Sequence, residues 1–458
     1  MQVKRIKYSF CIILVLSLLQ YSCKNEQRLP DQVTFTQHIA PILYKNCTQC
    51  HRPEGNGHFD LITYSQAKNY AASIAYVVRE RLMPPWPADP HYTEFVDQKV
   101  LSISDVKLIE KWVTDGALEG PYDALPKLPD YPYGSMMGKP DLQLPVKPCF
   151  MKANTGDKFL LVKVPYELPN DTFAAVLEFM AGKNNVVHHV NGDMVKYEFS
   201  KKKDVFAGEL VCDMVEDSTI KQAFEKLGLP NDDGTYPVLQ KSVVNYLPGV
   251  EAQRYPPGIG GYKLPRKGVF LLNDVHYGFS KKDVWDSSYI NVFFSKVPPS
   301  RPMMEFQLGT LGVVPVEPDL IVPANTVKKV SSHFTIPSDI SIITINPHMH
   351  LLGKSFKAYA LQPNGDTIRL INIPRWDFNW QYFYTFKKML KIPKGSTIVA
   401  EGVYDNTTQN PNNPFNPPQL IQDQKGSMRS TDEMFQFIVN YVMYKPGDEN
   451  ISLENPKK

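Results

Sequence analysis

The chain has 458 residues, more than one ordinary hydrophobic core holds, so its length predicts roughly two to four domains. A hydrophobic content of 43% is typical of a globular protein, and 39 prolines favour many short strands and turns over long helices. The net charge of +3 arises from Lys4, Arg5 and Lys7, and the balanced remainder argues against nucleic acid as a partner.

Residues 1–22 have the pattern of a secretory signal. They combine a basic start with an apolar run from Tyr8 to Leu19, which is too short to span a bilayer. We expect export to the periplasm or outer membrane, with Cys23 as a lipid-bearing first residue of the mature protein. Gln20 departs from the usual lipidation motif, and the alternative is an ordinary cleaved signal in which Cys23 has no role.

Residues 31–118 are expected to form a small all-α domain. It opens with FTQHIAPILYKNC and closes with LSISDVKLIEKWVTDGAL, whose apolar residues recur at three and four positions. Within it, Cys47-Thr48-Gln49-Cys50-His51 places two thiols three positions apart, directly before a histidine. The thiols can link to both vinyl groups of a haem while His51 reaches the iron, so the motif predicts covalent haem c. A zinc or redox site would need further ligands or a thioredoxin-like context, and neither is present.

The sixth ligand of the haem iron is expected to be Met83, in RERLMPPWPADP. Cytochromes c place an axial methionine downstream of the haem motif, and its thioether raises the reduction potential. His38 is interpreted as a structural or haem-edge residue. The alternatives are an open site or another donor, namely His58, His91, Met136 or Met137.

Residues 119–148 contain a proline every few residues and are expected to be an extended linker. Short β-rich runs follow, and they predict two tandem jelly-roll-type β-sandwiches over residues 149–298 and 299–458. Asn364-Gly365 predicts a hairpin turn. Cys149 and Cys212 could form one disulfide in an oxidising compartment, although the sequence does not show that they meet. The predicted fold class is therefore mainly β, preceded by the helical domain.

Five of the ten histidines fall into three clusters in this β-rich part. His348 and His350 lie two apart on a predicted strand, where both side chains point to the same face and can bind one metal. His188 and His189 are adjacent, so they can share a metal only at a strand end or a bulge. His276 stands alone in NDVHYGF. Such grouping is not typical of core packing.

The segments that contain these histidines resemble the conserved motifs of the type II copper monooxygenases, the family of peptidylglycine α-hydroxylating and dopamine β-monooxygenases. The resemblance covers residues 140–445 and rests on VHH, VHYG, HMHLLGK and STDEMFQFIVNYVM, in the family's order. It implies two copper ions, one in each sandwich. The first would be held by His188, His189 and His276, and the second by His348, His350 and Met434. The haem-bearing front end further resembles bacterial proteins in which a cytochrome c domain is fused to this module.

The ligand types agree with copper, because imidazole suits both of its redox states and a thioether favours Cu(I). The peptide-amidating members hold a substrate carboxylate with an arginine, an asparagine and a tyrosine, where this chain has Asn346, Gln436 and Ile438. A less charged substrate is expected. Trp380-Gln381 and the loop DNTTQNPNNP are interpreted as loop structure in preference to substrate pocket.

The leading hypothesis is a copper monooxygenase that uses O2 to hydroxylate a C–H bond of a small organic substrate. His348, His350 and Met434 are the expected catalytic copper ligands, and electrons would enter through the haem domain, from ascorbate or from another envelope donor. The alternative is an exported electron-transfer or copper-handling lipoprotein that oxidises no substrate.

Overall fold

The computed structural model describes residues 29–454 except 54, 56, 131–134, 136, 156–157, 183–185, 199, 214–218, 248–249, 251, 279 and 424–430. The predicted signal, its Cys23 and the alternative ligand Met136 therefore lie outside the described residues. No helix in the described part of the chain is both long and apolar enough to cross a membrane. Strands account for 38% and helices for 13% of the structure, which confirms the mainly β prediction.

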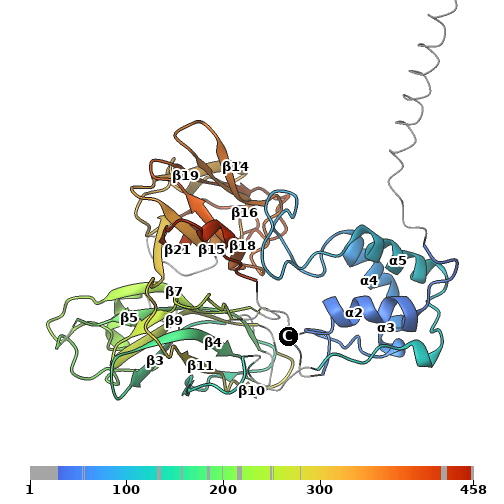
Figure 1. The fold of residues 1–458 in the computed structure, drawn as a ribbon, viewed down its shortest axis with the longest axis horizontal. Coiled ribbons are helices and arrows are strands. Elements are labelled where there is room, and N and C mark those ends of the chain that lie inside the picture. The colour runs from blue at the N-terminus through green and yellow to red at the C-terminus, as the bar shows by residue number, and fades with distance from the viewer. Residues whose placement is uncertain are drawn as a thin grey trace, which may run out of the picture. The chain divides into compact units, whose positions relative to one another are not determined.

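The chain divides into two compact units. The smaller comprises the described residues up to Thr48, together with Asp60–Pro84 and Leu101–Pro129, and it is helical (Figure 1). Its elements are η2 (Phe35–Ile39), α2 (Ala40–Asn46), α3 (Tyr64–Asn69), α4 (Ala71–Arg79), α5 (Ile103–Thr114) and η3 (Tyr122–Ala124). The Ser102 hydroxyl accepts from the Asp105 backbone N–H at the start of α5, in a capping box. The core of this unit includes Phe35 and Trp112, whose ring centroids are 6.2 Å apart.

The larger unit comprises Gln49–Phe59, Pro85–Val100 and the described residues from Asp130 onward. The first half of its β-rich part contains β1 (Leu142–Pro145), β2 (Phe150–Met151), β3 (Lys158–Glu167), β4 (Thr172–Met180), β5 (Val187–Lys196), β6 (Val211–Asp213), α6 (Ile220–Lys226), β7 (Val238–Tyr246), β8 (Tyr262–Leu264), β9 (Lys267–Tyr277), β10 (Val284–Trp285) and β11 (Tyr289–Phe294). Within the described residues, these strands form the sheets β6-β3-β9-β5-β7 and β1-β11-β4-β8 and the pair β10-β2. Phe179 of β4 packs on Tyr246 of β7, so the two sheets face each other across an apolar core.

The second half contains β12 (Met304–Gly309), β13 (Ile321–Val322), β14 (Thr326–Thr335), β15 (Ile340–Met349), β16 (Gly353–Leu361), β17 (Thr367–Ile373), β18 (Tyr384–Ile392), β19 (Thr397–Asn406), β20 (Ile421–Gln422), β21 (Phe435–Met443) and η4 (Asp448–Asn450). Its described sheets are β12-β21-β15-β18 and β14-β19-β16-β17, with the pair β13-β20. Phe356 of β16 stacks on Phe435 of β21 across the core. β16 and β17 form the predicted hairpin, in which Gly365 alone of the turn pair has a positive φ, +90°.

Three expectations from the sequence differ from the structure. Residues 142–145, inside the predicted linker, form β1 at a sheet edge, where a proline is tolerated. Residues 85–100, inside the predicted helical domain, belong to the larger unit, because Val96 N–H donates to Thr385 O at 2.8 Å. Cys149 and Cys212 are not bonded to each other, since they lie in separate hydrophobic clusters.

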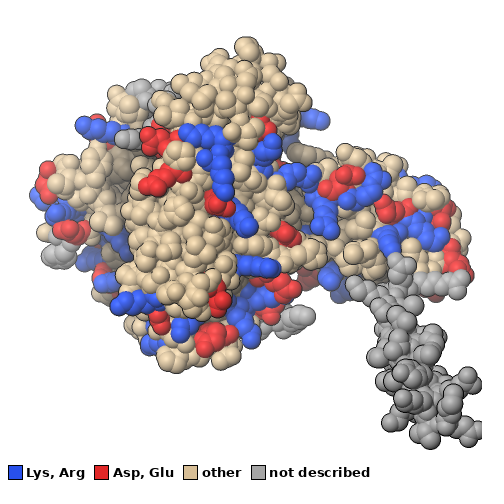
Figure 2. Space-filling view, turned by 90° about the horizontal axis from the view of Figure 1, so that it is seen from above, with Lys and Arg blue, Asp and Glu red and all other residues tan. Residues whose placement is uncertain are grey.

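Charges of both signs are interspersed over the face shown in Figure 2. One ion pair is buried in the second half of the β-rich part. Arg301 donates to Asp448 at 2.7 and 2.5 Å, and the Ser341 hydroxyl donates to the same carboxylate at 2.6 Å. Burial by itself would raise the pKa of Asp448, but the hydrogen bonds from Arg301 and Ser341 outweigh it and lower that pKa to about 2.

Replacing Asp448 with Asn is expected to lower the free energy of unfolding at pH 7 by about 3 kcal/mol, because Arg301 would keep its charge without a buried partner. The folded carboxyl has the lower pKa, so its contribution is present above the unfolded pKa and is lost as the pH falls toward 2. Urea unfolding between pH 3 and pH 7 measures both effects. The exposed neighbour Glu449→Gln is the control. A difference between wild type and Asp448→Asn that stays constant with pH would contradict the assignment.

Candidate metal centre

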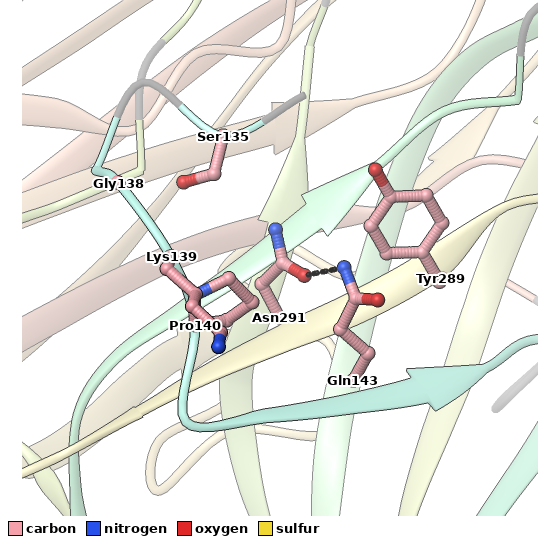
Figure 3. Close-up of a pocket in the computed structure, with 7 residues that line it drawn as sticks. All are labelled: Ser135, Gly138, Lys139, Pro140, Gln143, Tyr289 and Asn291. Carbon is pink, nitrogen blue, oxygen red and sulfur yellow. Dashed lines mark hydrogen bonds between the residues drawn. The ribbon is translucent and has the colours of Figure 1, made fainter. Parts of the chain in front are cut away.

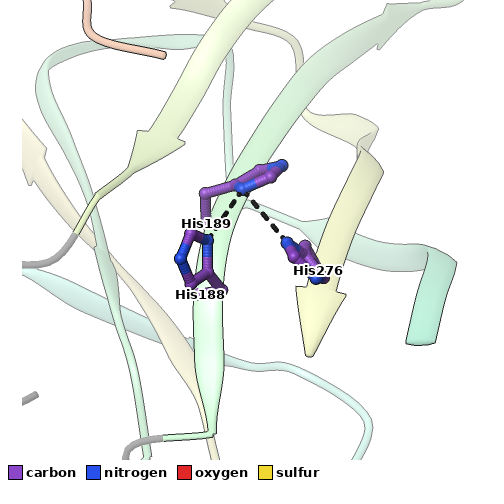
Figure 4. A group of neighbouring side chains, drawn as sticks. All are labelled: His188, His189 and His276. Carbon is purple, nitrogen blue, oxygen red and sulfur yellow. Dashed lines mark hydrogen bonds between the residues drawn. The ribbon is translucent and has the colours of Figure 1, made fainter. Parts of the chain in front are cut away.

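His188, His189 and His276 form a compact cluster, called here the first histidine group (Figure 4). His188 and His189 lie at the start of β5, and the pairing with β9 shifts register between Val187 and His189. This is the bulge that two adjacent histidines need if both are to reach one metal. His276, on β9, is paired with His189.

The spacing of the ring nitrogens fits a metal ion. The Nδ1 atom of His189 lies 3.3 Å from Nδ1 of His188 and 3.4 Å from Nδ1 of His276, and one ligand atom from each residue falls within 4.8 Å of the others. Two nitrogens that each lie about 2.0 Å from one ion at a tetrahedral angle are about 3.3 Å apart. Three imidazoles at this spacing can therefore hold one copper ion without rearrangement.

A buried carboxylate orients this group. The Nε2 atom of His189 lies 2.9 Å from Oδ2 of Asp274, so Nε2–H donates to the carboxylate and Nδ1 keeps its lone pair for a metal. Burial would raise the pKa of Asp274, but the neighbouring His189 and His276 lower it to about 2. Phe159 stacks on His276 at 4.3 Å and fixes the plane of that ring. Sequence reasoning did not identify Asp274.

His348 and His350 form the second histidine group, with ring centroids 4.9 Å apart. The Nδ1 atom of His348 is hydrogen-bonded to Oε1 of Gln381, and that of His350 lies 3.0 Å from Asp432 O. Both Nδ1 atoms thus face acceptors, and both Nε2 atoms remain for a metal. Burial, followed by the neighbouring His350, lowers the pKa of His348 to about 3, so its ring is neutral, as a metal ligand requires.

Met434 reaches this group through strand register. β15 pairs with β21 so that His348 faces Gln436 and Met349 faces Phe435, and the next position along both chains brings Met434 opposite His350. Because side chains alternate, Met434 shares a face with both histidines. Its side chain is buried.

Glu433, beside Met434, fastens the backbone around the second group. Its carboxylate accepts from the backbone N–H groups of Leu352 at 2.7 Å, His350 at 3.0 Å and Met434 at 3.2 Å. Burial outweighs these bonds and raises the pKa of Glu433 to about 8. One side chain therefore ties the HxH turn to the strand that carries the methionine.

The loop of residues 374–383, called here the bridging loop, contacts both histidine groups. Phe378 lies 6.3 Å from His189 and 5.6 Å from His350 between ring centroids, edge-on to each. Trp380 lies 6.2 Å from His188. The Phe378 ring thus contacts one histidine of each group, and the interpretation of Trp380-Gln381 as plain loop structure was incomplete.

The CxxCH segment has the geometry that a haem ligand needs. Nδ1 of His51 lies 3.0 Å from Phe59 O, which leaves Nε2 for an iron, and Cys47 caps the C-terminus of α2. The chain passes so close to His51 that a Cβ on Gly57 would lie 2.6 Å from Nδ1. Burial raises the pKa of the Cys50 thiol.

The candidates for the sixth haem ligand lie in different surroundings. Met83 follows α4 and is 36% exposed, and Met137 is partly buried. His58 and His91 are exposed, and His38 has a structural contact, because its Nδ1 accepts from the Thr34 backbone N–H at 3.1 Å. The described contacts join none of these side chains to His51.

The three positions that differ from the carboxylate-binding members are buried or bonded to backbone. Asn346 donates to Tyr382 O at 3.0 Å, Gln436 donates to Thr310 O at 3.2 Å, and Ile438 is buried. None of these three side chains carries a positive charge that could bind a substrate carboxylate. Asn406, in the asparagine-rich loop, donates to three backbone carbonyls and has a structural role.

A separate hollow of about 440 Å³ lies beside β1 and β11 (Figure 3). Its lining includes Gln143 and Asn291, which are hydrogen-bonded to each other at 3.0 Å. It shares no residue with either histidine group.

Comparisons with known proteins found weak similarity to solved structures and one family match within the chain. Among solved structures, those of the Gx and Gt strains of infectious bursal disease virus are similar at 8% and 10% identity, over 68% and 69% of this chain and 83% and 87% of theirs. Their TM-scores of 0.16 and 0.15 are too low to bear on fold or function. No curated protein matches.

Residues 309–454 match the family model described as copper type II ascorbate-dependent monooxygenase, C-terminal domain. The match spans His348, His350 and Met434 together with the strands that carry them. The part of the chain from residue 309 to residue 454 is therefore similar to the C-terminal domain of the copper type II ascorbate-dependent monooxygenases.

Proposed function

We propose that this chain is an exported copper monooxygenase that hydroxylates a C–H bond of a small, weakly charged organic substrate. The reaction consumes one O2, two electrons and two protons, and it yields the alcohol and water. The observation that carries the proposal is the convergence of three Nδ1 atoms at metal-ligand spacing, beside a domain of a copper-dependent family.

Copper at the second histidine group would supply O2 activation, and copper at the first would supply the second electron. His348, His350 and Met434 would hold the former, and His188, His189 and His276 the latter. Asp274 and Gln381 fix the tautomers of the rings they contact.

We also propose that the chain carries haem c at the CxxCH segment and that this haem feeds electrons to the first copper. Cys47 and Cys50 would form the thioether links, with His51 and Met83 as axial ligands. The hydrogen bond from His51 Nδ1 to Phe59 O supports this assignment, because it presents Nε2 to the iron.

The β-rich part is proposed to be two jelly-roll-type sandwiches. Anchoring through Cys23 would keep the enzyme at a membrane surface in the periplasm or on the outer membrane.

Replacing Met434 with Ile should reduce hydroxylation to background, because isoleucine fills the same buried volume but offers no thioether to Cu(I). Product formation under O2 with ascorbate and a panel of uncharged substrates measures this, and the haem spectrum should not change. Met443→Ile, exposed at the far end of β21, is the matched control. Retained turnover in Met434→Ile would overturn the ligand assignment. Oxygen uptake without product in the wild type would favour the copper-handling alternative.

Replacing Asp274 with Ala should weaken copper binding at the first histidine group by about 10- to 100-fold, the usual cost of losing a partner that orients a ligand. Asp274→Asn keeps the acceptor without the charge and should lie between the alanine variant and wild type. Cu(II) titration followed by electron paramagnetic resonance measures the affinity. Asp366→Asn, in the exposed hairpin turn, controls for net charge. Unchanged affinity in the alanine variant would show that Asp274 does not orient His189.

A further inference from the structure

Aromatic side chains form a continuous series that begins at the first histidine group. The ring of His188 lies 6.2 Å from Trp380, and Trp380 stacks on Tyr382 at 6.3 Å with an interplanar angle of 17°. Tyr382 in turn lies 5.2 Å from Trp86. Rings with centroids at these separations are in or near van der Waals contact. The series therefore connects a proposed copper ligand to residues 85–100 without an intervening gap.

The outer end of the series is hydrogen-bonded to the segment that follows the proposed sixth haem ligand. The Tyr382 hydroxyl donates to Pro85 O at 2.7 Å, and Pro85 lies two residues after Met83. Burial, followed by the Cys50 thiol, raises the pKa of Tyr382. The indole N–H of Trp86 is buried and has no acceptor among the described residues. A buried donor without an acceptor marks a place where the polypeptide alone is incomplete.

Core packing accounts for only part of this arrangement. Tyr384 and Phe95 are fully buried and pack on Trp86 as ordinary core residues. Trp380, in contrast, is only partly buried and extends from that core to the edge of His188. Phe378, on the same loop, contacts the rings of His189 and His350 and not Trp86. Trp380 and Tyr382 are therefore the rings of the bridging loop that connect His188 to Trp86.

We infer that Tyr382 and Trp380 form the path by which electrons pass from the haem to the copper held at the first histidine group. The inference rests on the proposed function and names the residues that connect its two cofactors. In each transfer one electron leaves ferrous haem, which becomes ferric, and reduces Cu(II) to Cu(I). No atom or proton changes place, and the rings carry no net charge before or after.

The experiment uses the full-length holoprotein with haem and both coppers loaded. Under anaerobic conditions the haem is reduced by a flash-generated electron donor while the copper is Cu(II), and haem absorbance follows its reoxidation. Trp380→Leu removes the ring next to His188 and should slow reoxidation by about tenfold or more, the change that an added barrier of about 1.4 kcal/mol gives. Trp380→Phe keeps a ring there and should restore most of the rate. Trp285→Leu, an exposed tryptophan outside the series, should transfer at the wild-type rate.

Copper content and the Cu(II) resonance spectrum are recorded for each variant, so that a lost metal is not mistaken for a lost path. If Trp380→Leu retains its copper and reoxidises haem at the wild-type rate, the path is wrong while the proposed function stands. If wild-type haem never reduces the copper, both the path and the haem relay fail, and hydroxylation with ascorbate shows whether the oxygenase remains. If wild-type protein binds no copper or haem, the proposed function itself fails.

Discussion

The bridging loop of residues 374–383 is the physical constraint on which the arrangement of the candidate site depends. Its backbone spans the stretch between β17 and β18, and it contacts groups that lie far apart in the sequence. Phe378 lies against both histidine groups, Gln381 bonds to His348, and Trp380 lies against His188. The orientation of several proposed ligands therefore depends on one short segment, which Tyr382 fastens to Pro85. A substitution that loosens this loop would disturb both metal sites together.

Around the loop, partly buried acceptors hold three of the imidazoles in the tautomer that a metal ligand needs. Asp274 accepts from His189, Gln381 from His348, and the Asp432 carbonyl from His350. Burial keeps the His348 ring neutral, with its pKa near 3. The imidazoles are thus oriented before any metal binds, because in each contacted ring one nitrogen is hydrogen-bonded to the protein and the other can act as a metal ligand. The single carboxylate in contact with the first group also offsets part of the charge that a bound copper ion would bring.

The sequence was informative where periodicity or spacing sets the structure. Short β-rich runs predicted the strands of both halves, Asn364-Gly365 predicted the hairpin, and the adjacency of His188 and His189 required the bulge that the structure contains. Residues that act through tertiary contact were missed. Gln381 and Phe378 reach the histidines only because β17 and β18 bring their loop over the site, and no local pattern marks such a contact. Asp274 carried a weak signal, since it lies two positions before His276 on one strand face.

The domain boundaries could not be predicted from local sequence patterns either. The frequent prolines of residues 119–148 led to the prediction of a linker, although β1 lies within it. Residues 85–100 pack on β18, although they lie between helices in the sequence. Cys149 and Cys212 lie in separate hydrophobic clusters, which shows that two cysteines outside other motifs need not pair with each other. These outcomes reflect long-range packing, which sequence spacing does not encode.

The central claim is that one chain combines a c-type haem with two copper ions. The most direct test is elemental analysis of purified, copper-supplemented protein, with haem counted independently from its absorbance after alkaline pyridine treatment. The account predicts one covalently bound haem iron and two coppers per chain, with the haem retained after acid-acetone extraction. A chain that holds zinc in place of copper, or that releases its haem to acid acetone, would contradict it.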